Sequence, residues 1–453
     1  MNSNATDVAN QETSPTEVSF WQALLFWLKL GFISFGGPAG QIAIMHQELV
    51  ERRRWISERR FLHALNYCMV LPGPEAQQLA TYIGWLMHRT WGGIVAGGLF
   101  VLPSLFILIG LSWVYIAFGD VPVVAGLFYG IKPAVAAIVV QAAHRIGSRA
   151  LKNNVLWAIA AAAFVAIFAL NLPFPLIVAA AAVAGFVGGR MRPDLFKAGG
   201  GHSKGSTSHG RALIDDETPV PAHARFSWAR LSSVLFAGAV LWLCPMGILI
   251  GTCGWDHTLT QMAWFFTKAA LLTFGGAYAV LPYVYQGAIG TYGWLTPTQM
   301  IDGLALGETT PGPLIMVVAF VAFVGGYVKA LFGVDQLFLA GAVAAALVTW
   351  FTFLPSFVFI LGGGPLIEST HDDIKFTAPL TAITAAVVGV VLNLALFFGY
   401  HVLWPDGFEG AFDWRAAMIA VGAAIALFQF KARVIQVIAG CALIGLIVSF
   451  IDK

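Results

Sequence analysis

The sequence predicts an all-α polytopic membrane protein, built from two inverted repeats of transmembrane and Gly/Pro-broken helices that one extra transmembrane helix joins. Composition is the first observation: 58% of the 453 residues are hydrophobic and 11% are charged, whereas soluble domains carry about 25% charged residues. Mean hydropathy is +0.78, and apolar runs recur that approach the roughly 20 residues needed to span a bilayer. The other two observations are a duplicated set of motifs and one apolar segment without a counterpart.

The duplication keeps a constant spacing. Each motif in the first half recurs 239 residues later: Lys29 as Lys268, Phe35-Gly36-Gly37 as Phe274-Gly275-Gly276, Trp55 as Trp294, and Pro72-Gly73-Pro74 as Pro311-Gly312-Pro313. Duplicated apolar units interrupted by Gly and Pro are typical of secondary transporters, in which the substrate site lies between the two halves.

These patterns divide the chain into five parts: a polar tail (1–19), a first repeat (20–189), a linker (190–230), a linking transmembrane helix (231–252) and a second repeat (262–450). The polar composition of the linker predicts a flexible, solvent-exposed segment. Its three histidines, His202, His209 and His223, lack the spacing of a metal site. The tail has no basic region leading into a short apolar core, so we expect no cleavable signal peptide.

Charge predicts the orientation. The loop at 46–60 carries five arginines (Arg52, Arg53, Arg54, Arg59 and Arg60), and its equivalent at 285–299 carries no charge. Basic loops mark the cytoplasmic side, so this loop and the linker are expected to be cytoplasmic. The membrane itself is expected to be the plasma (inner) membrane, as the family resemblance given below implies. If each repeat crosses the bilayer an even number of times, the linking helix inverts the second copy.

Two stretches are expected to be re-entrant hairpins, 61–87 turning at 71–74 and 20–45 turning at 36–38. Non-helical backbone at membrane depth is tolerated only where protein or a water-filled cavity surrounds it. The alternative is a full helix with a kink, because Pro alone can kink a transmembrane helix.

The Pro-Gly-Pro turns are candidate anion sites. Free amides at a helix start carry a positive dipole end of about half a charge and bind anions. In two inverted copies, the amides around 75–77 and 314–316 would converge near the midplane; the alternative is that these are packing kinks. The predicted substrate-binding residues are Lys29, Gly36, Gly37, Gln41, Pro72, Gly73, Pro74, Gln77, Gln78, Lys268, Gly275, Gly276, Pro311, Gly312 and Pro313.

Within this set, the lysines and glutamines have two interpretations each. A lysine in an apolar segment costs roughly 2.5–3.5 kcal/mol on insertion scales. Lys29 and Lys268 are therefore either paired cationic ligands for a divalent oxyanion or side chains that snorkel to the interface. The glutamine amides either donate to oxyanion oxygens or form interhelical hydrogen bonds.

The carboxylates differ between the copies. Glu75 matches Leu314, Glu308 matches Met69, and Asp302 matches His63. A carboxylate beside an anion site repels substrate when it is ionised and not when it is protonated, so Glu75 and Glu308 are the proton-coupling candidates. The alternative is that each is a structural acid bonded to loop backbone.

Other function classes find little support in the sequence. A net charge of +2 gives no reason to expect a nucleic-acid partner. The four cysteines form no CxxC and no metal spacing, and we expect no metal or cofactor. The chain has no nucleophile–base pair, so we expect no catalytic residues.

The motifs resemble the chromate ion transporter family in its long, duplicated form. The matching strings are 35–38 with Gln41, Arg54-Trp55, 71–74 with Gln78, 100–104 echoed by 353–356, 273–282, and 303–313. A departure is Gln41-Ile42-Ala43, where relatives more often show a His-Ile-Gly-type string. The resemblance implies a plasma-membrane transporter that exports chromate, with sulfate as the natural analogue, and so confers chromate resistance.

The drive implied by this resemblance is the membrane potential, the proton gradient or both. Two alternatives stay open: uptake of sulfate or another oxyanion by proton symport, and an anion channel. The expected partners are the oxyanion and the lipid bilayer, and the sequence leaves the oligomeric state open, a homodimer included.

Overall fold

The computed structural model describes residues 17–119, 121–196, 212–216, 218–219, 221–369 and 377–451. Within these residues the secondary structure is helical, apart from one isolated bridge that pairs Ile56 with Ile214. Seven of the described helices are long and apolar enough to cross a membrane: α4, α5, α7, α8, α13, α14 and α16. The predicted class, an all-α polytopic membrane protein, is confirmed.

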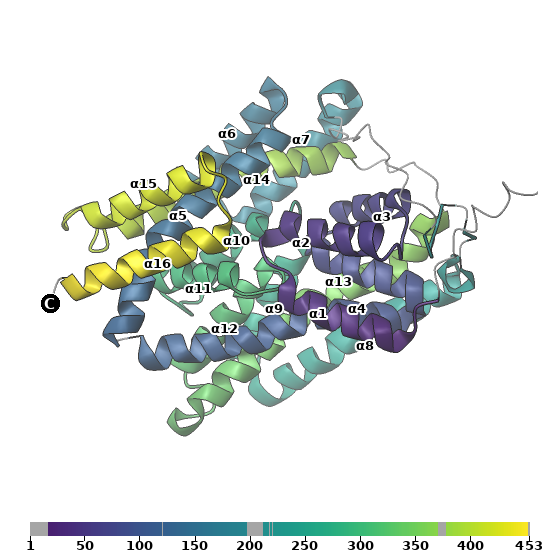
Figure 1. The fold of residues 1–453 in the computed structure, drawn as a ribbon, viewed down its shortest axis with the longest axis horizontal. Helices are drawn as coiled ribbons and strands as arrows, with labels where there is room; N and C mark the ends of the chain where they lie inside the picture. Colours follow the sequence, from purple (N-terminus) through teal and green to yellow (C-terminus); the bar gives the residue numbers. More distant parts are fainter. Residues whose placement is uncertain are drawn as a thin grey trace, which may run out of the picture.

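The helices before and including the linking helix are α1 (Phe20–Ile33), α2 (Gly37–His46), α3 (Glu58–Val70), α4 (Glu75–Phe118), α5 (Pro122–Ala150), α6 (Asn154–Phe168), α7 (Phe174–Met191) and α8 (Trp228–Cys253). Those after it are α9 (Thr258–Leu271), α10 (Ala277–Tyr285), α11 (Pro297–Thr309), α12 (Val317–Val328), α13 (Leu337–Ser369), α14 (Thr377–Leu403), α15 (Trp414–Phe428) and α16 (Val434–Ile451). Figure 1 shows α15 and α16 beside α5 at one end of the molecule, and α1, α3 and α8 gathered at the other.

Local structure repeats at the spacing of the motifs. A π-helical segment spans Gln47–Arg52 and another spans Gln286–Thr291. The second begins 239 residues after the first. Arg54 has φ 51° and its match Gly293 has φ 58°, which places both in the left-handed region. Equal motifs therefore impose equal backbone geometry in the two copies.

The α4 helix has two arms. His88 and Arg89 leave helical geometry, with Arg89 at φ 56° and ψ −157°. The chain reverses there, since a Cβ built on Gly84 would meet the side chain of Ala96 and the backbone of Gly92. Residues 75–87 thus form a short arm and 90–118 a long one.

α3 and the short arm of α4 form a helical hairpin. Arg60 near the start of α3 and Tyr82 towards the end of the short arm both contact Glu368 of α13. The two segments therefore run antiparallel and return to the same end of the molecule. The stretch 61–87 is thus a helical hairpin that turns at 71–74, whereas its re-entry into the membrane stays a prediction.

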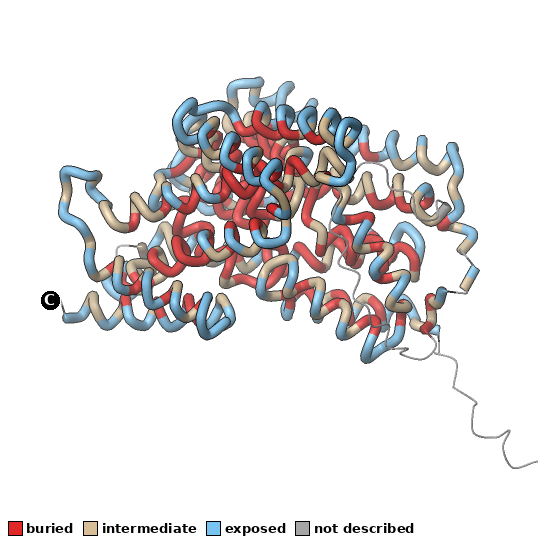
Figure 2. The backbone as a smooth tube through the Cα atoms, turned by 90° about the horizontal axis from the view of Figure 1, so that it is seen from above, coloured by how far each residue is buried: buried red, intermediate tan, exposed pale blue. Residues whose placement is uncertain are grey.

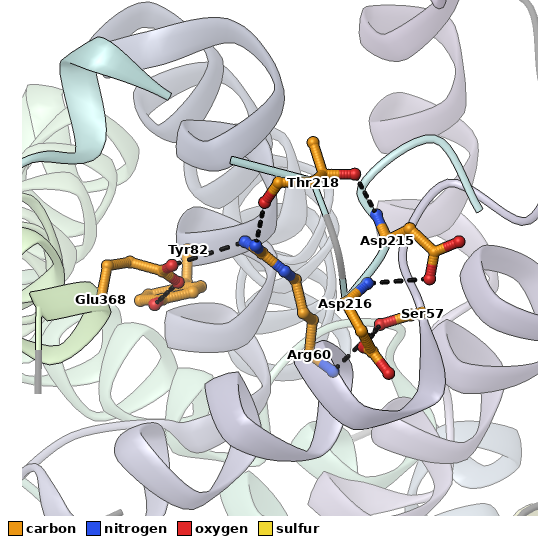
Figure 3. A network of polar contacts seen from close by, with 7 residues as sticks. All are labelled: Ser57, Arg60, Tyr82, Asp215, Asp216, Thr218 and Glu368. Carbon is orange, nitrogen blue, oxygen red and sulfur yellow. Dashed lines mark hydrogen bonds and ion pairs between the residues drawn. The ribbon is translucent and has the colours of Figure 1, made fainter. Parts of the chain in front are cut away.

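The described part of the linker is docked rather than free. Leu213 donates its N–H to the Arg54 carbonyl at 2.9 Å, and Ser57 donates its N–H to the Ile214 carbonyl at 3.0 Å. The Arg60 guanidinium joins the Thr218 carbonyl, at 2.6 Å, to Glu368, at 3.5 Å (Figure 3). We call this end of the molecule, formed by 52–60, 82–89 and the described linker residues 212–216, 218–219 and 221–224, the linker face.

His223, from the same linker, also lies on this face. Its Nε2 is 3.0 Å from the Trp85 carbonyl oxygen. Burial lowers the pKa of His223, so the ring donates as a neutral imidazole. His202 and His209 lie outside the described residues.

Burial follows the expectation for a bilayer protein. In Figure 2 the buried backbone lies in the middle and exposed residues surround it. The stretch 314–324 is buried throughout, whereas apolar side chains of α8 are exposed, such as Phe236 at 72% and Ile248 at 64%. Exposed apolar side chains on a spanning helix are suited to contact lipid.

Candidate functional site

The duplicated turns meet each other through backbone hydrogen bonds. The N–H of Gly73 donates to the Thr273 carbonyl, and the N–H of Gly312 donates to the Ser34 carbonyl, both at 2.8 Å. Ser34 and Thr273 are matched residues, so the two bonds are reciprocal. We call the region formed by 34–37, 71–74, 273–276 and 310–313 the turn centre.

Glycine is required in these turns for two reasons. All six have a positive φ that side chains rarely adopt: Gly36 89°, Gly37 69°, Gly73 129°, Gly275 79°, Gly276 97° and Gly312 104°. In addition, a Cβ on Gly312 would lie 2.7 Å from Ser104 Cβ. Close approach of the backbones, together with left-handed geometry, explains this residue type.

Each turn also meets a serine from the other half of the chain. Ser104 of the Leu-Pro-Ser string on α4 lies against Gly312, and Ser356 of the matching string on α13 lies against Gly73. The Gln78 Nε2 bridges the Pro72 carbonyl, at 2.8 Å, and the Ser356 hydroxyl, at 3.4 Å. The long helices therefore cross over to support the opposite turn.

Two buried glutamines of the first repeat, Gln41 and Gln78, contact the turn centre. Gln41 donates Nε2 to the Gly312 carbonyl at 2.5 Å. Gln77, next to Gln78 on α4, donates to Thr81 at 3.0 Å. Several buried polar atoms of α2, α4 and α13 have no hydrogen-bond partner among the described residues: Oε1 of Gln41, Gln77 and Gln78, Oγ of Ser104 and Oγ1 of Thr352. A buried polar atom without a partner is costly. The Nε2 of Gln41 and of Gln78 each donates to a backbone carbonyl, which fixes the orientation of both amides.

The two half-helix starts differ. α4 begins at Glu75 directly after Pro74, and Glu75 is half-buried. In the second copy, residues 314–316 form a 3₁₀ turn before α12, and these side chains are buried and apolar. The predicted pair of anion-binding termini is thus unequal, with polar side chains on the first repeat alone.

Among the described residues, neither lysine side chain forms a hydrogen bond with the turn centre. Lys29 is exposed on α1, and Lys268 is half-buried with Nζ 5.5 Å from the Trp264 ring centroid. Exposure of Lys29 agrees with the snorkelling alternative. Their role as paired ligands stays a prediction.

Glu308 is buried beside the second turn. It is 7% exposed, one residue before the end of α11, and the Tyr278 hydroxyl donates to its Oε1. Glu308 therefore has a hydrogen-bond donor from α10, which suits either a structural or a coupling role.

A further buried carboxylate pairs with a lysine that sequence analysis missed. Lys132 of α5 places Nζ 3.6 Å from Oδ2 of Asp302, and the Tyr115 hydroxyl donates to the same oxygen at 2.8 Å. The signal was present, because Lys132 interrupts the apolar run 121–140 as Lys29 interrupts its own.

Comparison with known proteins gives consistent matches. A family model described as "Chromate transporter" matches residues 21–186 and 260–446. The chain is 33% identical over 392 residues to the chromate transport protein of Pseudomonas aeruginosa, covering 86% of this chain and 83% of that protein. It is 26% identical over 451 residues to the chromate transport protein of Cupriavidus metallidurans, covering 98% and 96%. No solved structure was found to match.

Proposed function

The chain belongs to the chromate transporter family, and from that premise we propose that it exports chromate, a tetrahedral divalent oxyanion, across the plasma membrane. The observation that carries the proposal is the turn centre, where reciprocal bonds from Gly73 and Gly312 join the two copies around buried polar atoms that lack partners among the described residues. Substrate sites of repeat-built transporters lie at such an interface.

In this proposal the oxyanion binds among the glutamine amides and the turn amides. Gln41 and Gln78 would give up their long second contacts, to the Ser34 carbonyl at 3.5 Å and the Ser356 hydroxyl at 3.4 Å, and donate that N–H to the anion. Gln77 has an N–H beyond its bond to Thr81, and Ser104 supplies a hydroxyl. Movement of one copy against the other would break the backbone hydrogen bonds that join a turn to the opposite half of the chain. New bonds would then form in the alternate state of the transporter. The inverted arrangement of the copies, which the linking helix α8 favours, gives two such states of similar energy.

Energetics favour export. Moving two negative charges out of a negative interior gains about 4.6 kcal/mol per 100 mV, at roughly 2.3 per charge. The membrane potential therefore suffices as a drive, and proton coupling through Glu308 or Glu75 would add to it. Sulfate uptake is the alternative that buried Glu308 favours, because an imported dianion needs a coupled proton.

Radiolabelled chromate flux into inside-out vesicles tests the proposal, with pH and voltage gradients imposed separately. We expect saturable flux that sulfate inhibits, and a loss of about tenfold or more in Gln78→Leu, because the amide that joins Pro72 to Ser356 is removed. Glu308→Gln should weaken the response to pH while keeping the response to voltage. Loss of chromate flux in Lys29→Ala would identify Lys29 as a ligand, and unchanged flux would identify it as a snorkelling side chain.

Gln436→Leu is the matched control, since Gln436 is exposed on α16 and should leave flux unchanged. Absence of saturable chromate flux in the unmodified protein would rule out the proposed substrate. A conductance that does not saturate would instead indicate a channel.

A further inference from the structure

A polar pocket opens at the end of the molecule opposite the linker face. Its volume is about 590 Å³, and it lies among the end of α4, the first half of α5, the start of α11 and the loop after α12. The long arm of α4 runs from the kink at Arg89 to Phe118, about 40 Å at 1.5 Å per residue. The pocket is therefore far from the docked linker. Ser104, which meets Gly312 at the turn centre, lies 11 residues before the pocket residue Tyr115 on α4, about 16 Å at 1.5 Å per residue, so the pocket is also distinct from the turn centre.

One wall of the pocket holds the ion pair of Asp302 and Lys132, and one oxygen of the Asp302 carboxylate has no hydrogen-bond partner among the described residues. Asp302 is 1% exposed, and its Oδ2 accepts from Tyr115 at 2.8 Å and lies 3.6 Å from Lys132 Nζ. Its Oδ1 is buried without a hydrogen-bond partner among the described residues. A buried carboxylate oxygen in this state is costly unless a proton or another donor occupies it.

The same pocket also contains hydrogen-bond donors, which an anion requires. Lys132 carries three N–H donors, its side chain is 28% exposed, and its contact with Asp302 is long. Thr298 contributes a hydroxyl. Gln299 accepts the Thr296 N–H through Oε1 at 2.8 Å, so its Nε2 is the end left to donate.

We propose that this pocket binds a tetrahedral oxyanion together with one proton, the anion on Lys132 and the proton on Asp302. An ionised Asp302 both repels a dianion and holds the ammonium of Lys132. When the carboxylate takes up a proton it becomes a neutral acid, and Lys132 keeps its charge and turns to the anion. This inference rests on the proposed function, because it assigns a second, proton-linked position to the same substrate class.

Few other charges face Asp302. Tyr115 on α4, Lys132 on α5 and Tyr327 on α12 are the titratable groups that line the pocket with it. Lys329 and Asp335 are exposed on the adjoining loop. The other helices packed against α11 are α14 and α16; neither contains Asp, Glu, Lys or Arg, and α14 adds only Tyr400 and His401 near its end.

Equilibrium binding of radiolabelled sulfate to the purified full chain tests the inference between about pH 5 and 8. Sulfate remains a dianion in this range, so a change in affinity reports on the protein. We expect affinity to rise as pH falls, by at most about tenfold per pH unit for one linked proton. Calorimetry in two buffers of different ionisation enthalpy should show uptake of a proton on binding.

Variants separate the two roles. Asp302→Asn should bind sulfate with an affinity that no longer depends on pH, Lys132→Gln should lose about tenfold or more, and Lys132→Arg should retain binding and so report an intact fold. Lys329→Gln and Asp335→Asn, both exposed beside the pocket, are the matched controls and should behave as the unmodified chain. Gln78→Leu, which alters the turn centre, should keep the pH-linked binding.

Unchanged sulfate affinity in Lys132→Gln, or an unchanged pH response in Asp302→Asn, would overturn the inference. If chromate flux still saturates in those variants and is lost in Gln78→Leu, the proposed function stands without the pocket. If the unmodified chain neither transports nor binds chromate or sulfate, both proposals fail.

Discussion

Single residues determine whether the two copies can meet. Gly312 has φ 104°, and a Cβ added to it would lie 2.7 Å from Ser104 Cβ, so a side chain there is excluded by both backbone strain and lack of space. The same holds for its match Gly73, whose Cβ would lie 2.5 Å from Gln78 Nε2. Function at the turn centre is therefore sensitive to one methyl group.

Gly312→Ala should lower both stability and flux. Left-handed backbone in a non-glycine residue costs about 1–3 kcal/mol, and the shift of Ser104 adds to it, so we expect a lower thermal midpoint and a flux reduced by about tenfold or more. Gly110→Ala is the control, because Gly110 is helical on α4 with open space around its Cβ position. Thermal unfolding of the purified chain and vesicle flux measure the two effects; equal behaviour of both variants would contradict the argument.

The sequence predicted the residues of the turn centre better than those of the pocket. Fixed spacing identifies matched glycines without any knowledge of the fold, and the resemblance to the chromate ion transporter family that they supported is confirmed. Lys132 and Asp302 have no matched spacing: Lys132 only interrupts an apolar run, the two lie on different helices far apart in sequence, and only tertiary packing joins them. The pattern of apolar residues could not predict that Lys29 is exposed either.

At the scale of elements, the long helices show where the copies diverge. Matched turns are 239 residues apart, whereas Ser104 and Ser356 are 252 apart. The additional residues form the connection between α12 and α13, where the first copy has the sharp kink of α4 at Arg89. Periodicity could not predict this difference, because a kink and a short loop both interrupt an apolar run.

Arg60, Glu368 and Tyr82 tie three helices together at the linker face (Figure 3). The side chains of Arg60 and Glu368 are 15% and 8% exposed, and removal of one partner from such a pair leaves an uncompensated charge. Opening of the hairpin towards this face must break the contact. The pair therefore keeps the linker face closed in this structure.

Glu368→Gln should make the hairpin of α3 and the short arm of α4 open more often at the linker face. Cys68 on α3 is fully buried, so its rate of maleimide labelling reports on hairpin opening in a background without the exposed Cys244 and Cys253. We expect the rate to rise by about fivefold or more, since the labelling rate follows the free energy of local opening. Asp335→Asn, an exposed change on the far loop, is the control; a Cys68 rate equal in both variants would contradict a closing role.

At the scale of the whole molecule, the orientation of the second copy depends on α8. Its 26 residues extend about 39 Å at 1.5 Å per residue, which suffices to carry the chain across a bilayer. Docking of Leu213, Ile214 and Thr218 onto the arginine-rich loop places this part of the linker beside the residues with the strongest cytoplasmic signal. From these two facts we expect α9 to begin outside the cell.

The two ends of α8 provide the measurement. Ser227 precedes the helix and is exposed, and Cys253 ends it and is exposed. With the other cysteines replaced, a membrane-impermeant maleimide should label Cys253 in intact cells and a cysteine at position 227, from Ser227→Cys, only in inside-out vesicles. Labelling of both positions from one side would mean that α8 does not cross. The second copy would then have the orientation of the first, its turn could not approach the first as an inverted partner, and alternating access between two equivalent states would lose its structural basis.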